Sequence, residues 1–113
     1  MTATADGQAE KTEKTEKFAC LVRARAHPGR GDELIEGYAA VFAQVSGEEK
    51  TEHFVLSRAV DDPDLFFCFE IFASRADFDA HRAKAKSGNE LDALNAATAE
   101  REFVWGIPVW SKS

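Results

Sequence analysis

Three side chains in this sequence are candidates for acid–base chemistry: His81, Glu70 and His53. His81 shares one face of a predicted helix with Phe78, so its imidazole should point toward the apolar space beneath that helix. A neutral imidazole in such a space can take a proton from a phenol or from an acidic C–H group. A core histidine that is hydrogen-bonded to a neighbour would give the same pattern, so both interpretations stay open.

Glu70 is the only charged residue in the apolar run from Leu65 to Phe72. A buried carboxylate is costly unless it is paired or hydrogen-bonded, so Glu70 should hold His81 or an arginine in place. We favour this structural role and keep a catalytic role as the alternative. His53 begins the preceding strand and has no evident partner in the sequence. A surface histidine is the more common case there, and a second acid–base group is the alternative.

Apolar aromatic side chains are numerous, with nine Phe against one Tyr. Those that could line a flat cavity for an aromatic ligand are Phe42, Phe54, Phe67, Phe72, Phe78 and Trp105. Such stripes are also typical of an ordinary core, so a lining role is one of two interpretations. Arginines on predicted strands could stabilise an oxyanion or simply lie at the sheet rim. These arginines are Arg23, Arg25 and Arg58.

Hydrophobic periodicity predicts the elements that must position these side chains. Strands are predicted over residues 18–26, 53–60, 65–72 and 102–110. Helices are predicted over residues 34–45, from Ser74 to Ser87, and over a shorter stretch, residues 89–100. Expected to share a face are Phe18, Cys20, Val22 and Ala24 in the first strand, Phe54, Leu56 and Val60 in the second, and Phe103, Trp105 and Ile107 in the last. Pro108 cannot donate a ladder hydrogen bond, so that end should lie at an edge or bulge.

The order of elements is βαββαβ, which predicts an α+β fold of the ferredoxin-like kind, one antiparallel sheet with helices on a single face. Apolar residues on the other face would then lack cover. A second copy of the same sheet, related by a twofold axis, would supply it, so we expect a homodimer. A monomer with a partly polar open face is the alternative.

The 113 residues suit one domain, residues 18–113, after a disordered tail over residues 1–17 in which Thr-Glu-Lys repeats. A net charge of −6 without a basic block argues against nucleic acid and anionic membranes as partners. No apolar run approaches the ~20 residues needed to span a bilayer. The chain begins without the apolar core of a signal peptide, so we expect a cytoplasmic location.

Cofactor signatures are missing from the sequence. No glycine-rich loop follows a strand, and no His, Cys and carboxylate set has metal-ligand spacing, so we expect neither a nucleotide or flavin cofactor nor a metal. Cys20 and Cys68 lie in apolar runs without C-x-x-C spacing. They are interpreted as two buried thiols, with a disulfide or a catalytic thiol as the alternatives.

Several residues within these elements and at their ends resemble the sequence pattern of the antibiotic-biosynthesis monooxygenase family. The similar features are Pro28-Gly29 before a helix, the Asp61-Asp62-Pro63 turn, the segment Phe69-Glu70-Ile71-Phe72-Ala73-Ser74, and His81 on the following helix. The resemblance covers residues 18–109 and implies a dimeric α+β barrel. It implies little about the reaction, since the family includes cofactor-free oxygenases, haem-degrading enzymes, an isomerase and members without known activity.

The leading hypothesis is therefore a cofactor-independent monooxygenase for a quinol-like or anthrone-like aromatic. The resemblance also places His81 at the iron ligand of the haem-degrading branch. That branch has an asparagine in the first strand, which this chain lacks, and a tryptophan where this chain has Phe72. A non-catalytic ligand-binding or assembly module is the main alternative. An isomerase would need a second acid–base partner, for which Glu70 or His53 would have to serve.

Overall fold

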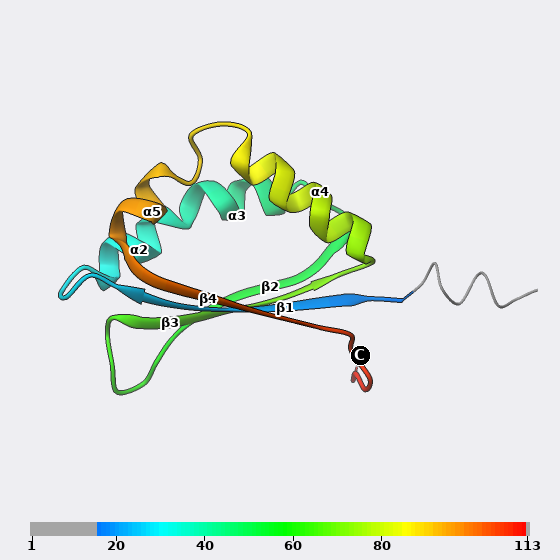
Figure 1. Cartoon of the computed structure of the whole chain (residues 1–113), viewed down its shortest axis with the longest axis horizontal. Helices are drawn as coiled ribbons and strands as arrows, with labels where there is room; N and C mark the ends of the chain where they lie inside the picture. The colour runs from blue at the N-terminus through cyan, green and yellow to red at the C-terminus, as the bar shows by residue number, and fades with distance from the viewer. Residues whose placement is uncertain (1–15, 113) are drawn as a thin grey trace, which may run out of the picture.

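The computed structural model describes residues 16–112. It contains a single sheet with helices on one side, as the apolar patterns predict. Most of the predicted tail, residues 1–15, lies outside the described residues. The elements are β1 (Phe18–Ala26), α2 (Gly31–Gly37), α3 (Ala39–Val45), β2 (Thr51–Arg58), β3 (Leu65–Phe72), α4 (Arg75–Lys86), α5 (Asp92–Ala97) and β4 (Thr98–Gly106). The strand order is β2-β3-β1-β4 and every pairing is antiparallel. The helices all cover the same face (Figure 1), which confirms the predicted ferredoxin-like fold.

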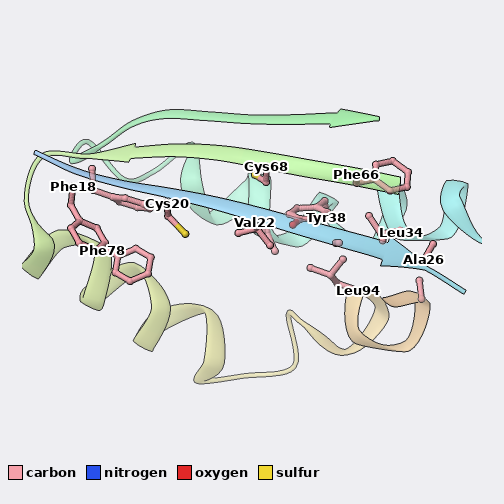
Figure 2. Packing of buried hydrophobic residues seen from close by; sticks show 14 residues of the cluster. Phe18, Cys20, Val22, Ala26, Leu34, Tyr38, Phe66, Cys68, Phe78 and Leu94 are labelled. Carbon is pink, nitrogen blue, oxygen red and sulfur yellow. The ribbon is translucent and has the colours of Figure 1, made fainter. Parts of the chain in front are cut away.

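The inner face of the sheet, toward the helices, carries the core. Residues at every second position of β1 are buried, as the period of two predicts. In β3, the buried set includes Cys68 and Glu70, which lie opposite Val22 and Cys20 of β1. Figure 2 shows Cys20, Val22 and Cys68 of these strands on the side of the sheet where Phe78 and Leu94 of the helices lie.

The predicted helix over residues 34–45 is instead two short helices, α2 and α3, which meet at Tyr38. Gly37 lies against α5, where an added Cβ would stand 2.6 Å from Leu94 Cα. Only glycine permits that approach, and glycine is also a weak helix former. The break therefore lies where α5 packs against the helix backbone.

The helix that carries His81 begins as the sequence predicts. Ser74 Oγ accepts a hydrogen bond from the Asp77 backbone N–H at 3.2 Å, the usual N-cap contact. The Asp77 carboxylate accepts a 2.7 Å hydrogen bond from the Ser74 hydroxyl. In a full capping box, the side chain at this position would instead accept a hydrogen bond from the backbone N–H of the N-cap residue, Ser74. Phe78 and His81 share the buried face of α4, as predicted, and Ala85 is buried on it as well.

Two strand boundaries differ from the prediction. β2 runs from Thr51 to Arg58, so Val60 lies in the following turn and is fully exposed. β4 runs from Thr98 to Gly106. Its pairing with β1 begins where Thr98 lies opposite Ala26, so residues 98–100 of the predicted helix 89–100 belong to the strand instead. Ile107 therefore lies beyond the strand.

The outer face of the sheet has no helix over it (Figure 1). Its exposed apolar side chains are Leu21, Val55, Phe67, Phe69 and Val104. β3 is apolar on both faces apart from Glu70, but in a single chain only its inner face is covered. Among residues 16–112, no helix is long and apolar enough to cross a membrane.

Candidate active site between the helices and the sheet

A cavity of about 300 Å³ lies between the inner face of the sheet and the helices. Its lining is largely apolar, but it includes one carboxyl, one imidazole and three cationic side chains. The lining residues are Val22, Tyr38, Val41, Phe54, Glu70, Phe78, His81, Arg82, Ala85, Lys86, Leu91, Leu94, Asn95, Arg101 and Phe103. An apolar hollow with a few convergent polar groups is the usual form of a small-molecule site.

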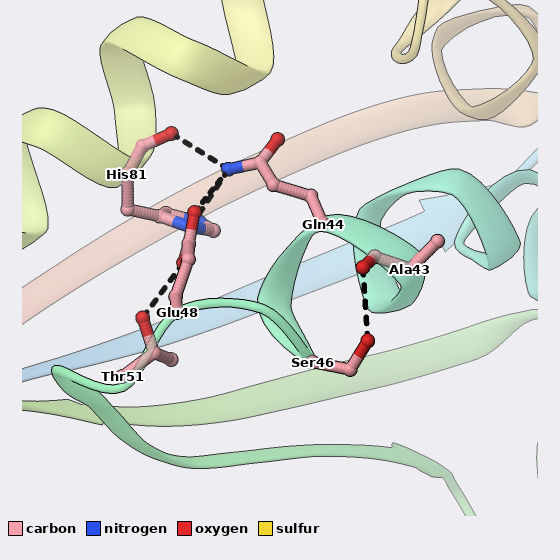
Figure 3. A network of polar contacts seen from close by, with 6 residues as sticks. All are labelled: Ala43, Gln44, Ser46, Glu48, Thr51 and His81. Carbon is pink, nitrogen blue, oxygen red and sulfur yellow. Dashed lines mark hydrogen bonds and ion pairs between the residues drawn. The ribbon is translucent and has the colours of Figure 1, made fainter.

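His81 is held by a carboxylate and is only 6% exposed. Its Nδ1 lies 3.0 Å from Glu48 Oε1, and the Gln44 amide donates to the His81 carbonyl oxygen at 3.3 Å (Figure 3). Because a carboxylate only accepts hydrogen bonds, Nδ1 carries a proton, and in the neutral imidazole Nε2 then keeps its lone pair. Within residues 16–112, no side chain or backbone group hydrogen-bonds Nε2. His81 is therefore oriented as a base with a free acceptor.

Glu48, in the loop between α3 and β2, completes this arrangement. Burial opposes its ionisation, but three hydrogen bonds outweigh burial and lower the pKa of Glu48. Gln44 donates to its Oε2 at 2.6 Å, Thr51 donates to its Oε1 at 2.7 Å, and His81 provides the third bond. Glu48 was not predicted from the sequence, because a glutamate in a polar loop carries no distinctive signal before the loop is folded.

Aromatic rings surround the imidazole. The His81 ring centroid lies 5.2 Å from that of Phe72 and 5.7 Å from that of Phe54. Phe42 packs edge-on against Phe54 at 5.1 Å, and Phe78 packs against Phe72 at 5.2 Å. Phe54 and Phe78 line the cavity, while Phe72 and Phe42 back the lining. Trp105 reaches the group through Phe78, with 6.2 Å between the ring centroids.

His53 and Phe67 lie on the other face of the sheet. His53 pairs with Ile71 in the β2–β3 register and borders a separate hollow with Val55, Phe69 and the C-terminal segment. Successive residues of a strand point to opposite faces, so Phe54 lines the cavity and its neighbour His53 does not. The structure thus brings His81 and Glu70 to one cavity and separates His53 and Phe67 from it.

Glu70 faces the cavity and is only 5% exposed. No ion pair or hydrogen bond joins it to His81 or to an arginine within residues 16–112, so the expected structural contact is not formed there. Burial raises the pKa of Glu70 to about 7, although the adjacent Cys68 thiol and the charge of Arg82 both oppose that change. Glu70 can therefore change protonation state near neutral pH.

The thiols have the opposite character. Cys20 and Cys68 are both free and buried. Burial raises the pKa of Cys20 to about 12 and also raises that of Cys68. A neutral, enclosed thiol is a poor nucleophile, which agrees with the interpretation of both residues as buried apolar groups.

Two of the three strand arginines singled out in the sequence form ion pairs away from the cavity, and Arg23 lies on the outer face of the sheet opposite Glu102. Arg25 binds Asp62 at 3.0 Å and Arg58 binds Asp32 at 2.8 Å. The arginines that do line the cavity, Arg82 and Arg101, were not identified from the sequence. Within residues 16–112, no group of three or more His, Cys, Asp or Glu residues could hold a metal ion.

The fold and the cavity define a small α+β protein with a hollow between the sheet and the helices. The sequence model of the antibiotic biosynthesis monooxygenase family matches residues 17–89, and the chain belongs to this family.

Solved structures share this fold at low identity. A candidate antibiotic biosynthesis monooxygenase of Nitrosomonas europaea is 21% identical with a TM-score of 0.76, over 88% of this chain and 96% of that one. A second, of Chloroflexus aurantiacus, is 19% identical with a TM-score of 0.73, over 86% and 97%. SnoaB, a cofactor-independent oxygenase from Streptomyces nogalater, is 16% identical with a TM-score of 0.75, over 85% and 96%. No curated protein matches the chain in sequence.

Proposed function

We propose that this protein is a cofactor-independent monooxygenase that acts on an electron-rich aromatic molecule of the quinol or anthrone type. One observation carries the proposal: His81 lines the cavity, its Nδ1 is held by the Glu48 carboxylate, and nothing within residues 16–112 hydrogen-bonds its Nε2. The similarity in fold to SnoaB, itself a cofactor-independent oxygenase, supports the same class of reaction.

The reaction asks the protein to accept one proton from the substrate. His81 Nε2 would remove a proton from the CH₂ group of an anthrone, leaving an enolate. The enolate would give one electron to O₂, and the resulting radical and superoxide would combine to form a C–O bond. Protonation would give a hydroperoxide, and cleavage of its O–O bond with loss of the remaining C–H proton would release water. The CH₂ group becomes C=O, so one oxygen atom enters the product and the other leaves as water.

The apolar lining serves the same chemistry. Phe54 and Phe78 offer ring surfaces to a flat substrate, and a position between the sheet and the helices would hold it beside the imidazole. His81 is only 6% exposed and lies against the rings of Phe54 and Phe72, which would limit the water that can reprotonate the enolate before it meets O₂. The cavity volume of about 300 Å³ is at the lower end of the range for small-molecule sites, which favours a compact substrate.

Oxygen uptake tests this proposal. Protein treated with a chelator should consume O₂ with at least one substrate from a panel of anthrones and hydroquinones, above the rate without protein. An anthrone methylated twice at the reactive carbon has no proton to lose and should give no uptake. Binding of the panel without any uptake would contradict the oxygenase and indicate a non-catalytic binding module instead.

We also propose that two copies of the chain pair through the outer face of the sheet. The exposed apolar residues on that face lie mainly on the central strands. Beside them, Arg23 and Arg25 of β1 lie opposite Glu102 and Glu100 of β4, so the charges on this face balance. An apolar face without net charge is complementary to a copy of itself, as a twofold interface requires.

Phe69→Asp should convert a dimer into a monomer. Phe69 lies on β3 in the middle of the outer face and is 45% exposed in the single chain, and a carboxylate there would be buried without a partner. Sedimentation or light scattering measures the mass directly. Ile35→Asp, which adds the same charge at an exposed apolar position on α2, is the control and should remain dimeric. A wild-type protein that is monomeric at all concentrations would contradict this proposal.

A further inference from the structure

The charged residues that line the cavity are mostly cationic, whereas the chain as a whole is acidic. The chain carries a net charge of −6, yet the cavity is lined by Arg82, Lys86 and Arg101 against a single acidic residue, Glu70. The cationic groups come from α4 and from β4, two elements that meet at this cavity. A positive region in an acidic protein favours an anionic ligand at that position.

These three cations are not engaged elsewhere in the described structure. Arg25, Arg30, Arg58 and Arg75 each form an ion pair with a nearby carboxylate. No ion pair within residues 16–112 involves Arg82, Lys86 or Arg101. Arg101 donates only a 3.3 Å hydrogen bond to Thr98 Oγ1. Their charges are therefore available to a ligand.

Arg82 is positioned by aromatic rings. Its guanidinium carbon lies 4.8 Å from the ring centroid of Phe103 and 5.7 Å from that of Phe78. Contacts of this kind use the ring faces and leave the N–H donors unused, and no acceptor within residues 16–112 takes a hydrogen bond from this guanidinium. A guanidinium with free N–H donors binds a carboxylate through two parallel hydrogen bonds.

We propose that the substrate of this cavity is an aromatic carboxylate. Its carboxylate binds Arg82, with Arg101 nearby, and its ring lies against Phe54 and Phe78. The inference rests on the proposed function for its choice of an aromatic ring, but the anion site itself rests on the cations and the cavity. It narrows the substrate class from electron-rich aromatics to those that carry an acid group.

Glu70 fits this assignment. It is buried, faces the cavity and, within residues 16–112, forms no ion pair. Since burial raises the pKa of Glu70 to about 7, the protonated form is accessible at neutral pH. A protonated carboxyl does not repel an anionic ligand and can donate a hydrogen bond to it.

The test compares two ligands that differ only in charge. 2-Naphthoate and its methyl ester are titrated into the full chain, with affinity measured by calorimetry at neutral pH. We expect the carboxylate to bind about tenfold or more tightly than the ester. Arg82→Gln should abolish that preference while changing the affinity for the ester by less than about twofold. Lys84→Gln, which removes a charge from the exposed side of the same helix, is the matched control and should keep the preference.

Equal affinity for the two ligands would overturn the inference, as would a preference that survives in both Arg82→Gln and Arg101→Gln. Arg101→Gln also replaces Arg82→Gln if the latter does not fold. Binding of neither ligand would overturn the inference as well. Since the titration involves no oxygen, a clear preference for the carboxylate together with no oxygen uptake would support the anion site and contradict the oxygenase reaction alone.

Discussion

His81→Ala is expected to lower kcat for oxygen consumption by about 100-fold or more, the usual contribution of a well-placed general base. His81 is the imidazole in the cavity, and Glu48 holds it in the tautomer that leaves Nε2 free. Alanine removes the base but leaves most of the apolar lining in place. KM should therefore change much less than kcat, which steady-state oxygen uptake separates directly.

His27→Ala is the matched control for that variant. His27 lies in the exposed turn after β1, so its loss should leave kcat within about twofold of the wild-type value. If His81→Ala consumed oxygen as fast as the wild type, His81 would have no part in the proton transfer. Glu70 would then be the remaining acid–base group in the cavity.

Glu70→Gln should change how stability depends on pH. Burial raises the pKa of Glu70 from its ordinary value of 4.5 to about 7, so the folded chain keeps this proton to a higher pH than the unfolded chain. Stability from this group is therefore greatest at or below about pH 4.5, and falls as pH rises to about 7. The shift corresponds to a loss of roughly 3 kcal/mol, at 1.36 kcal/mol for each pKa unit.

Glutamine cannot ionise, so the variant should not lose this stability. The unfolding free energy of Glu70→Gln relative to the wild type should rise by roughly 3 kcal/mol between about pH 4 and pH 8. Urea unfolding at one protein concentration measures the difference, and the fixed concentration keeps any contribution from self-association constant. A difference that stays constant over this range would show that Glu70 ionises in the folded protein as it does in water.

The architecture was predictable because local patterns agree with the global fold. The alternation in β1, the Ser74 cap and the buried face of α4 each depend on residues close together in the sequence. The element boundaries were less predictable. β4 takes over residues that favour helix, because pairing with β1 stabilises an extended strand there, and such pairing cannot be read from local pattern.

The site was only partly predictable, for a related reason. His81 and Glu70 stand out as polar residues at apolar positions, and that contrast is visible in the sequence. Glu48 reaches His81, and Arg101 reaches the cavity, through long-range packing, and neither residue breaks a local pattern. The face that His53 occupies depends on the register of β2, where a change of one residue reverses every side chain.

Proton removal inside the cavity is tested most directly by mixing protein and an anthrone in the absence of oxygen and recording the absorbance of the bound enolate. Without O₂ the later steps cannot occur, so the enolate should accumulate with the wild-type protein. We expect that signal to appear with the wild type and with His27→Ala, to be absent with His81→Ala, and to disappear when O₂ is admitted. A wild-type protein that binds the anthrone but never forms the enolate would contradict the assignment of His81 as the base.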